Sequence, residues 1–131
     1  MVVYRPIQID DYEAVRTFLA DNGWRDRVND VDRFRAIVVG ADRTVVALDG
    51  GRVVGFARVL CDGASNGYIS MVAVATDLRR QGIGRRLVEH LTQGDVGDIT
   101  WVLRAGRESR GFWERLGFVT SEIAMERVRR G

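Results

Sequence analysis

The 131-residue sequence lacks lysine and has one cysteine, one histidine and one proline. A lone cysteine, Cys61, cannot form an internal disulfide, and with His90 as the single histidine it does not make a zinc site, so we expect no metal. Without lysine the chain cannot contain a P-loop, which requires Gly-Lys-Ser/Thr. Apolar runs fall far short of the ~20 residues that a membrane-spanning helix needs, so we expect no membrane partner.

The composition is typical of a globular protein, with 46% apolar and 29% charged residues. The length suits one domain, so we expect residues 1–131 to form a single folded unit. The N-terminus lacks the charged start and long apolar middle of a signal peptide, and a cytoplasmic location is expected by default. The net charge is only +2. Nucleic acid is therefore an unexpected partner, although arginines gather in residues 104–110 and 127–130.

The most informative stretch reads VAVATDLRRQGIGRRLVEHL, where a strand pattern gives way to a helix pattern. Apolar residues alternate up to Val74 and then recur at helical spacing from Ile83. The junction between them holds arginines and two glycines, Gly82 and Gly84. Because the first N–H groups of a helix lack internal partners, such a junction favours a phosphate or pyrophosphate. The dinucleotide fingerprint GxGxxG does not fit, since Leu87 takes the place of its third glycine.

The rest of the chain predicts alternating strands and helices. Asp10 with Glu13 reads as a capping box for the first helix and Asp30 as the N-cap of the second, with a polar loop over residues 24–29 between them. The predicted strands are 2–7, 44–48, 52–60, 68–75 and 99–104, with a last strand or two in 118–128; the predicted helices are 10–22, 31–39, 83–93 and 109–116. This order predicts an α+β fold, a three-layer α/β/α sandwich in which a mixed, twisted β-sheet is flanked by helices on both faces.

Two signatures in the chain resemble those of the GNAT superfamily of N-acetyltransferases. The matching residues are Val74, Arg79, Gly82 and Gly84 in the first signature, and Phe112, Leu116, Gly117 and Phe118 in the second. The resemblance implies the GNAT fold, acetyl-CoA as cosubstrate, and direct transfer of an acetyl group to a primary amine. The family's final hairpin needs more chain than follows Phe118, so we expect it to be truncated here.

The resemblance also implies roles for individual residues. The pantetheine arm would pair with the backbone of Val72, Ala73 and Val74, like an added strand. The N–H of Val72 would polarise the thioester carbonyl. The residues expected around the pyrophosphate are Arg79 of the signature and the backbone of Arg80, Gln81, Gly82, Ile83, Gly84 and Arg85.

The chain departs from the family at the residue that protonates the leaving thiolate. Many members have a tyrosine after the signature phenylalanine, whereas this chain has Trp113, which can donate a hydrogen bond but cannot serve as an acid. The family's common asparagine is replaced by Gly106. We therefore expect Trp113 to pack over the cosubstrate, and Ser109 or Tyr68 are the alternatives for routing a proton. A general base is not evident: Glu108, Glu122 and Asp62 are candidates by position only.

By the same resemblance the acceptor lies between the first two helices and the last strands, where Trp24, Asp26, Asn29 and Asp30 would line the site. A small amine, a peptide N-terminus and a lysine side chain all remain open as acceptors. Two other hypotheses remain: a non-catalytic acyl-CoA-binding module, and an RNA-directed transferase acting on aminoacyl-tRNA. Edge pairing of the last strands would also permit a homodimer.

Overall fold

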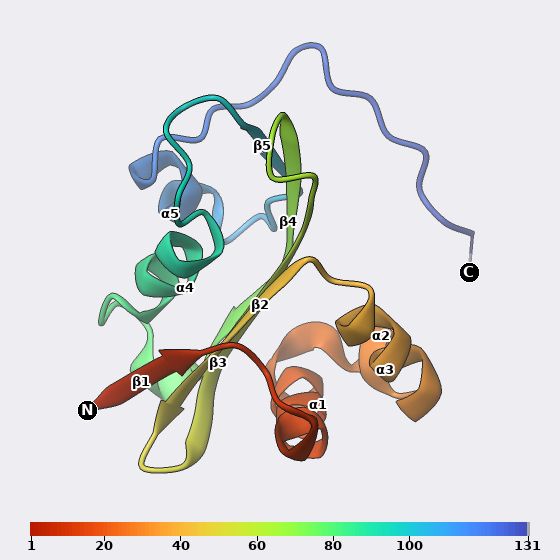
Figure 1. The fold of residues 1–131 in the computed structure, drawn as a ribbon, viewed down its shortest axis with the longest axis vertical. Coiled ribbons are helices and arrows are strands. Elements are labelled where there is room, and N and C mark those ends of the chain that lie inside the picture. The colour runs from red at the N-terminus through yellow and green to blue at the C-terminus, as the bar shows by residue number, and fades with distance from the viewer. Residues whose placement is uncertain (131) are drawn as a thin grey trace.

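The computed structural model describes residues 1–130, which form a five-stranded sheet between two layers of helices (Figure 1). The strands are β1 (Val2–Arg5), β2 (Arg43–Asp49), β3 (Arg52–Cys61), β4 (Asn66–Val74) and β5 (Thr100–Leu103), adjacent in that order. β1 to β4 pair antiparallel, and β5 joins β4 in parallel. The predicted mixed sheet is confirmed.

Helices cover both faces of this sheet, which confirms the three-layer prediction (Figure 1). On one face lie α1 (Tyr12–Leu19), α2 (Arg25–Val28) and α3 (Val31–Val39). On the other lie α4 (Ile83–Leu91) and α5 (Arg110–Arg115). Buried apolar side chains from the sheet and from both helix layers form one core, in which Phe34, Phe56 and Leu87 are among the largest fully buried residues.

The N-cap prediction is right for α3 and wrong for α1. The Asp30 carboxylate accepts a hydrogen bond from the N–H of Arg33 at 3.1 Å, as an N-cap does. The first helical segment instead begins two residues earlier, as a 3-10 turn over Ile9–Asp11 whose N-cap is Gln8. Asp11, not Glu13, closes the box: its carboxylate accepts from the N–H of Gln8 at 2.8 Å.

The predicted polar loop over residues 24–29 is wrong, because most of it is the short helix α2. α1 runs into a wide turn over Ala20–Trp24, in which Gly23 takes a φ of 95° and redirects the chain. α2 then buries Val28 completely. The polar residues around Val28 hid this single apolar anchor from the sequence pattern.

The predicted last strand in residues 118–128 is also wrong. Gly117, with a φ of 92°, turns the chain away from the sheet after α5, and residues 119–130 form no helix or strand. Ile123 and Met125 are 91% and 97% exposed, so their alternation finds nothing to pack against. The segment is tied by side chains instead, among them Arg104 to Glu126 at 2.9 Å. A strand without a partner or a packed face gains little stability.

We expect Gly67→Ala to destabilise the fold by about 1–3 kcal/mol, because the new methyl group would overlap the ring of Trp101. Gly67 and Trp101 face each other across the β4–β5 pair. The ring cannot easily move aside, since its Nε1 donates to the carboxylate of Asp95 at 2.7 Å. Urea unfolding measures the loss.

The matched control is Gly111→Ala in α5, where the nearest atom to an added methyl is the mobile end of Arg115 at 3.4 Å. Alanine is a better helix former than glycine by roughly 0.5–1 kcal/mol, so this variant should be neutral or slightly more stable. Equal stability of the two variants would contradict the packing we assign to Trp101.

Candidate functional site

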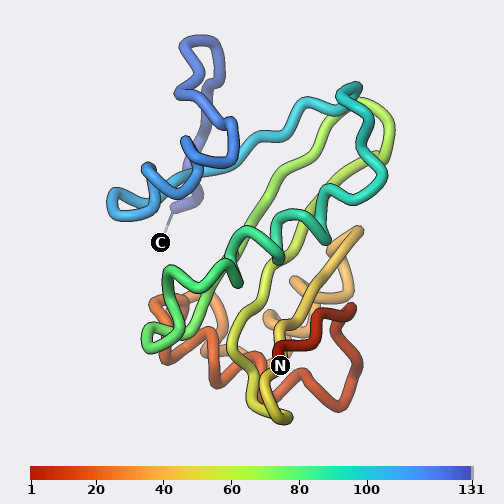
Figure 2. The backbone as a smooth tube through the Cα atoms, turned by 90° about the vertical axis from the view of Figure 1, so that its left-hand side faces the viewer, coloured from red at the N-terminus to blue at the C-terminus, as the bar shows by residue number. Residues whose placement is uncertain are grey.

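The sheet opens between β4 and β5. Their parallel pairing ends at Ile69 and Leu103, and β4 continues to Val74 while β5 turns away. The two strands run side by side and then diverge, as Figure 2 shows. An edge of β4 backbone is left in the gap, and such an edge can pair with an extended ligand as if with another strand. The residues predicted to hold pantetheine, 72–74, lie on this edge.

β4 is distorted where the gap opens. Phe56 of β3 pairs with Ala73, and Arg58 pairs with Ser70. One residue of β3 therefore faces two residues of β4, Met71 and Val72, which is a β-bulge. Met71 has a φ of 58°, a strained conformation for a residue other than glycine. Strain of this kind costs on the order of 1–3 kcal/mol and gathers at functional sites.

β4 leads directly into the start of α4. A 3-10 turn over Thr76–Leu78 is followed by Arg80 and Gly82, which both have positive φ values of 66° and 84°. Gly82 is the N-cap and has no side chain with which to satisfy the first N–H groups of the helix. The first intrahelical bond of this turn runs from Arg86 N–H to Gly82 O, at 3.1 Å. The preceding N–H groups of α4 are therefore open to an anion.

The predicted cosubstrate residues thus form one continuous path, from the open edge of β4 to the start of α4. Four of them carry side-chain charge or amide groups and are exposed: Arg79, Arg80, Gln81 and Arg85. Arginines around a helix N-terminus add positive charge to the partial charge of the helix dipole. The path therefore suits an extended ligand that ends in a pyrophosphate.

Glycine is required at positions 82 and 84 of the junction for two different reasons. Gly82 is needed for its backbone conformation, and an added methyl there would meet nothing within 4 Å. An added methyl at Gly84 would lie 2.9 Å from the ring of Phe112. Gly84 and Phe112 come from the two separate signatures, so their contact packs α5 against α4. Gly84 therefore has a packing role, and the predicted contact of its backbone N–H with a pyrophosphate stays a prediction beside it.

Trp113 lies in the core rather than in the opening. It is only 7% exposed and packs edge-on between Phe112 and Phe118, at ring distances of 4.9 and 5.3 Å. This arrangement agrees with a packing role. Two other residues are the alternative proton donors. The Ser109 hydroxyl donates to Gly106 O at 3.1 Å. Tyr68 is four residues from Val72 along β4, roughly 13 Å at strand spacing.

The predicted acceptor residues do not form one cluster. Trp24 is half-buried at the end of the wide turn that contacts β4. That turn is joined to the end of β4 by a hydrogen bond from Thr76 Oγ1 to Asn22 Oδ1 at 3.4 Å. Asp26 and Asn29 are exposed, while Asp30 serves as the cap of α3. Of the four, Trp24 lies best for contact with a molecule at β4.

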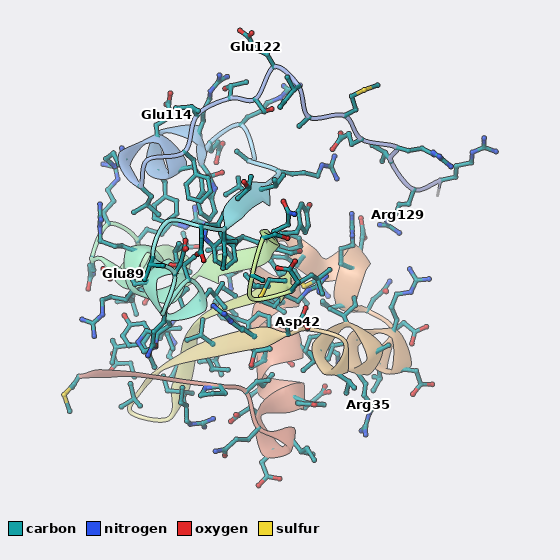
Figure 3. All side chains as sticks on the ribbon, turned by 45° about the horizontal axis from the view of Figure 1, so that its top comes forward. Arg35, Asp42, Glu89, Glu114, Glu122 and Arg129 are labelled. Carbon is teal, nitrogen blue, oxygen red and sulfur yellow. The ribbon has the colours of Figure 1, made fainter. Side chains whose placement is uncertain are left out.

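The three carboxylates named as candidate bases are either held by their own turn or exposed to solvent. Asp62 accepts from the N–H groups of three following residues in its turn, at 2.8 to 3.1 Å. A hydrogen bond from the Ser65 hydroxyl, with these backbone bonds, holds the pKa of Asp62 far below its usual range. Glu108 and Glu122 are exposed, and Glu122 points away from the body of the protein (Figure 3).

Residues 1–130 contain neither a metal-ligand cluster nor a membrane-spanning helix. No three His, Cys, Asp or Glu side chains gather there in a way that could hold a metal ion. No helix in that range combines the length and the apolar character needed to cross a membrane.

Sequence reasoning missed two features of the site, the bulge at Met71 and the position of Arg58. The bulge leaves no trace in the alternating pattern of β4. Arg58 did leave a signal, because it is a charged residue within the apolar run VVGFARVL of β3. It lies on the same side of the sheet as α2 and α3.

The fold and site define a class: a three-layer domain whose central strand ends at the uncapped start of a helix, beside a gap in the sheet. The chain belongs to the GNAT acetyltransferase domain family, whose model matches residues 40–120, more than half of the sequence. It is thus an acetyltransferase domain by family. A comparison with curated proteins finds no match.

Solved structures share the fold over nearly the whole chain. A probable acetyltransferase from methicillin-resistant Staphylococcus aureus is 23% identical, with a TM-score of 0.76 over 100% of this chain and 99% of that one. A Xanthomonas campestris protein assigned to the GNAT family is 22% identical, with a TM-score of 0.80 over 98% and 94%. A Clostridium acetobutylicum protein, classed by prediction as an acetyltransferase and solved with acetyl-CoA, is 16% identical, with a TM-score of 0.76 over 98% and 96%.

Proposed function

We propose that this domain transfers the acetyl group of acetyl-CoA directly to the nitrogen of a primary amine. The observation that carries the proposal is the continuous path from the open β4 edge to the uncapped start of α4. The path supplies backbone groups for an amide-containing arm and, at its end, N–H groups and arginines for a pyrophosphate. Acetyl-CoA has both parts, and it supplies an activated acyl group when bound.

The residues of the chain would act on the reaction as follows. The backbone of Ala73 and Val74 would hold the extended arm, and the N–H of Val72, beside the bulge at Met71, would donate to the thioester oxygen. This N–H stabilises the negative charge that develops there as the amine attacks. Preorganised donors of this kind act without rearrangement, which is why a strained backbone is retained at such a position.

The proposed reaction needs little help from the protein in transferring protons. A thiol with a pKa near ~8.5 leaves without a strong acid, so a buried tryptophan in place of the family's tyrosine does not prevent transfer. The incoming ammonium must still lose a proton, and because Asp62 is held by its own turn while Glu108 and Glu122 are exposed, we assign this step to solvent in the open gap. The rate should therefore rise with pH until the acceptor amine itself is deprotonated.

A second function, an acyl-CoA-binding module without catalysis, is favoured by two observations: Trp113 is buried, and the Ser109 hydroxyl donates a hydrogen bond to a backbone carbonyl. The two functions share the cosubstrate site and differ only in turnover. Thiol release from acetyl-CoA in the presence of an amine panel separates them.

The first experiment is calorimetric titration with acetyl-CoA, with ATP and NAD as controls. One-to-one binding of acetyl-CoA in the micromolar range, with no binding of ATP or NAD, is the expected result. The discrimination follows because only acetyl-CoA has an arm that can pair with β4. Equal affinity for ATP would show that the site recognises phosphates alone, and no binding of acetyl-CoA would overturn the proposal.

We expect Gly82→Val to lower the affinity for acetyl-CoA at least tenfold while the protein stays folded. Valine resists the φ of 84° at this N-cap, so the loop must change shape and move the N–H groups at the start of α4.

Gly51→Val is a close control for Gly82→Val. Gly51 has a φ of 85° and, like Gly82, no atom within 4 Å of an added methyl, but it lies in the β2–β3 turn. Both variants should lose about 1–3 kcal/mol of stability by urea unfolding. An equal loss of affinity in both would show that general destabilisation, rather than the phosphate site, is responsible.

Trp113→Phe should keep most of the turnover, because the side chain acts in packing. Removing part of a buried ring costs stability, so rates are compared at a temperature where circular dichroism shows both proteins fully folded. A thousandfold loss of kcat with unchanged acetyl-CoA affinity would instead give the indole a part in the chemistry.

A further inference from the structure

Three arginine side chains converge on a shallow hollow on the α1–α3 side of the sheet. Arg58 comes from β3, Arg27 from α2 and Arg33 from α3, around a volume of about 450 Å³. Ile37 and Leu60 contribute apolar surface to the same hollow. Like charges that share a small space repel one another, so the arrangement calls for an anion between them.

Arg58 differs from an ordinary surface arginine because water does not fully solvate its guanidinium. Its side chain is half-buried, and its Nε is fully buried with no hydrogen-bond partner within residues 1–130. Burial lowers the pKa of the guanidinium, Tyr68 opposes that fall, and Arg27 adds to it. The group stays charged nonetheless, because arginine is not deprotonated in proteins. A buried donor left without a partner is rare and requires an explanation.

Neighbouring carboxylates do not supply that partner. In the part of the chain that the structure describes, the ion pairs involve other arginines or the N-terminal amine, and none joins a carboxylate to Arg27, Arg33 or Arg58. Asp30, at the start of α3, is turned to the backbone N–H of Arg33 at 3.1 Å. Asp26 is exposed and does not line the hollow. The hollow is therefore positive.

Arg58 connects the hollow with the strand that carries the proposed site of reaction. Arg58 pairs with Ser70 in the sheet, and Ser70 is two residues before Val72, or about 7 Å at strand spacing. Arg27 belongs to α2, which follows the Trp24 turn beside β4. A molecule that places an amine at Val72 would need only a few bonds to reach the guanidinium groups.

The geometry points to a small acceptor amine that carries a carboxylate or phosphate group, held by Arg58, Arg27 and Arg33 while its amine lies beside Val72. This inference rests on the proposed function and narrows its acceptor. A guanidinium recognises either anion through paired N–H donors. A lysine side chain of a protein acceptor has no anionic group at a fixed distance from its amine. The hollow would therefore add nothing to its binding.

Matched pairs of amines test the inference: phosphoethanolamine against ethanolamine, and β-alanine against β-alaninamide. The readout is thiol release from acetyl-CoA. We expect the anionic member of at least one pair to have a kcat/KM about tenfold to a hundredfold higher, the effect of one or two charge-assisted hydrogen bonds. The pair that shows the preference identifies phosphate or carboxylate as the recognised group.

Arg58→Met should remove this preference, mainly through a higher KM for the anionic amine. Because it removes an unpaired buried charge, it should also raise the urea midpoint. Arg33→Gln and Arg35→Gln are a matched pair on α3. Arg35 lies outside the hollow, with its guanidinium over the ring of Tyr12 at 5.9 Å, and points away from the sheet (Figure 3). We expect a loss for Arg33→Gln alone.

The outcomes separate this inference from the proposed function. Acetyl-CoA turnover with equal rates for ethanolamine and phosphoethanolamine, and for β-alanine and β-alaninamide, would overturn the anionic acceptor and leave the transferase standing. Direct titration with phosphoethanolamine and β-alanine gives the converse: Arg58-dependent binding without acetyl-CoA binding supports the anion site and rejects the transferase. Salt-sensitive tRNA binding, with no preference within either pair of amines, would also overturn the inference.

Discussion

The distortion of β4 at Met71 is the constraint on which the rest of the site depends. A regular β4 would present its N–H and C=O groups to two neighbours in strict alternation, and β5 could pair with it along its whole length. The bulge adds a residue, bends the strand and increases its twist. It lies immediately beyond the last pair between β4 and β5, formed by Ile69 and Leu103. The gap that results gives a ligand access to the middle of the sheet, where edges are otherwise closed.

Two glycine–aromatic contacts keep the walls of this gap in place. Gly67 accepts the ring of Trp101 on the β5 side, and Gly84 accepts the ring of Phe112 on the α4 side. In each pair the missing side chain lets an aromatic ring lie directly on the backbone. The first contact joins β5 to β4 and the second joins α5 to α4, so β5 and α5 are fixed by separate contacts. The strain at Met71 is thus compensated by packing that begins only a few residues away.

Most of the layered fold could be predicted from the sequence, because its strands and helices have strong apolar periodicity. α3 and α4 show this best: each begins at the expected residue, and each buries the expected face. The errors occur where tertiary packing decides. Val28 is one buried side chain in a polar segment, and it makes a helix of a predicted loop. Residues 119–130 have an alternating stretch, but Gly117 directs them away from any strand that could pair with them.

The site shows the same division. The junction that we propose to bind phosphate could be predicted because glycines and arginines stand between a strand pattern and a helix pattern, and the two signatures indicated its type. The bulge was invisible, since Met71 is an ordinary strand residue in sequence and its φ of 58° comes from its surroundings. The assignment of Gly84 needed the structure for another reason. Its partner Phe112 is distant in sequence, so only the folded chain shows which atom occupies the space.

The presence of an arginine does not by itself indicate a functional site in this chain, because all 20 residues of the Lys and Arg types are arginine. Burial is what distinguishes Arg58 from the arginines that water solvates. A half-buried guanidinium without a partner lowers stability, and an apolar residue of similar size would pack between β3 and α3 at no such cost. Residues that reduce stability are retained where function requires them. The buried charge of Arg58 and the strained backbone of Met71 both reduce stability in this way. They lie within two positions of each other across the β3–β4 pair, next to Val72, the residue whose N–H the proposed reaction uses.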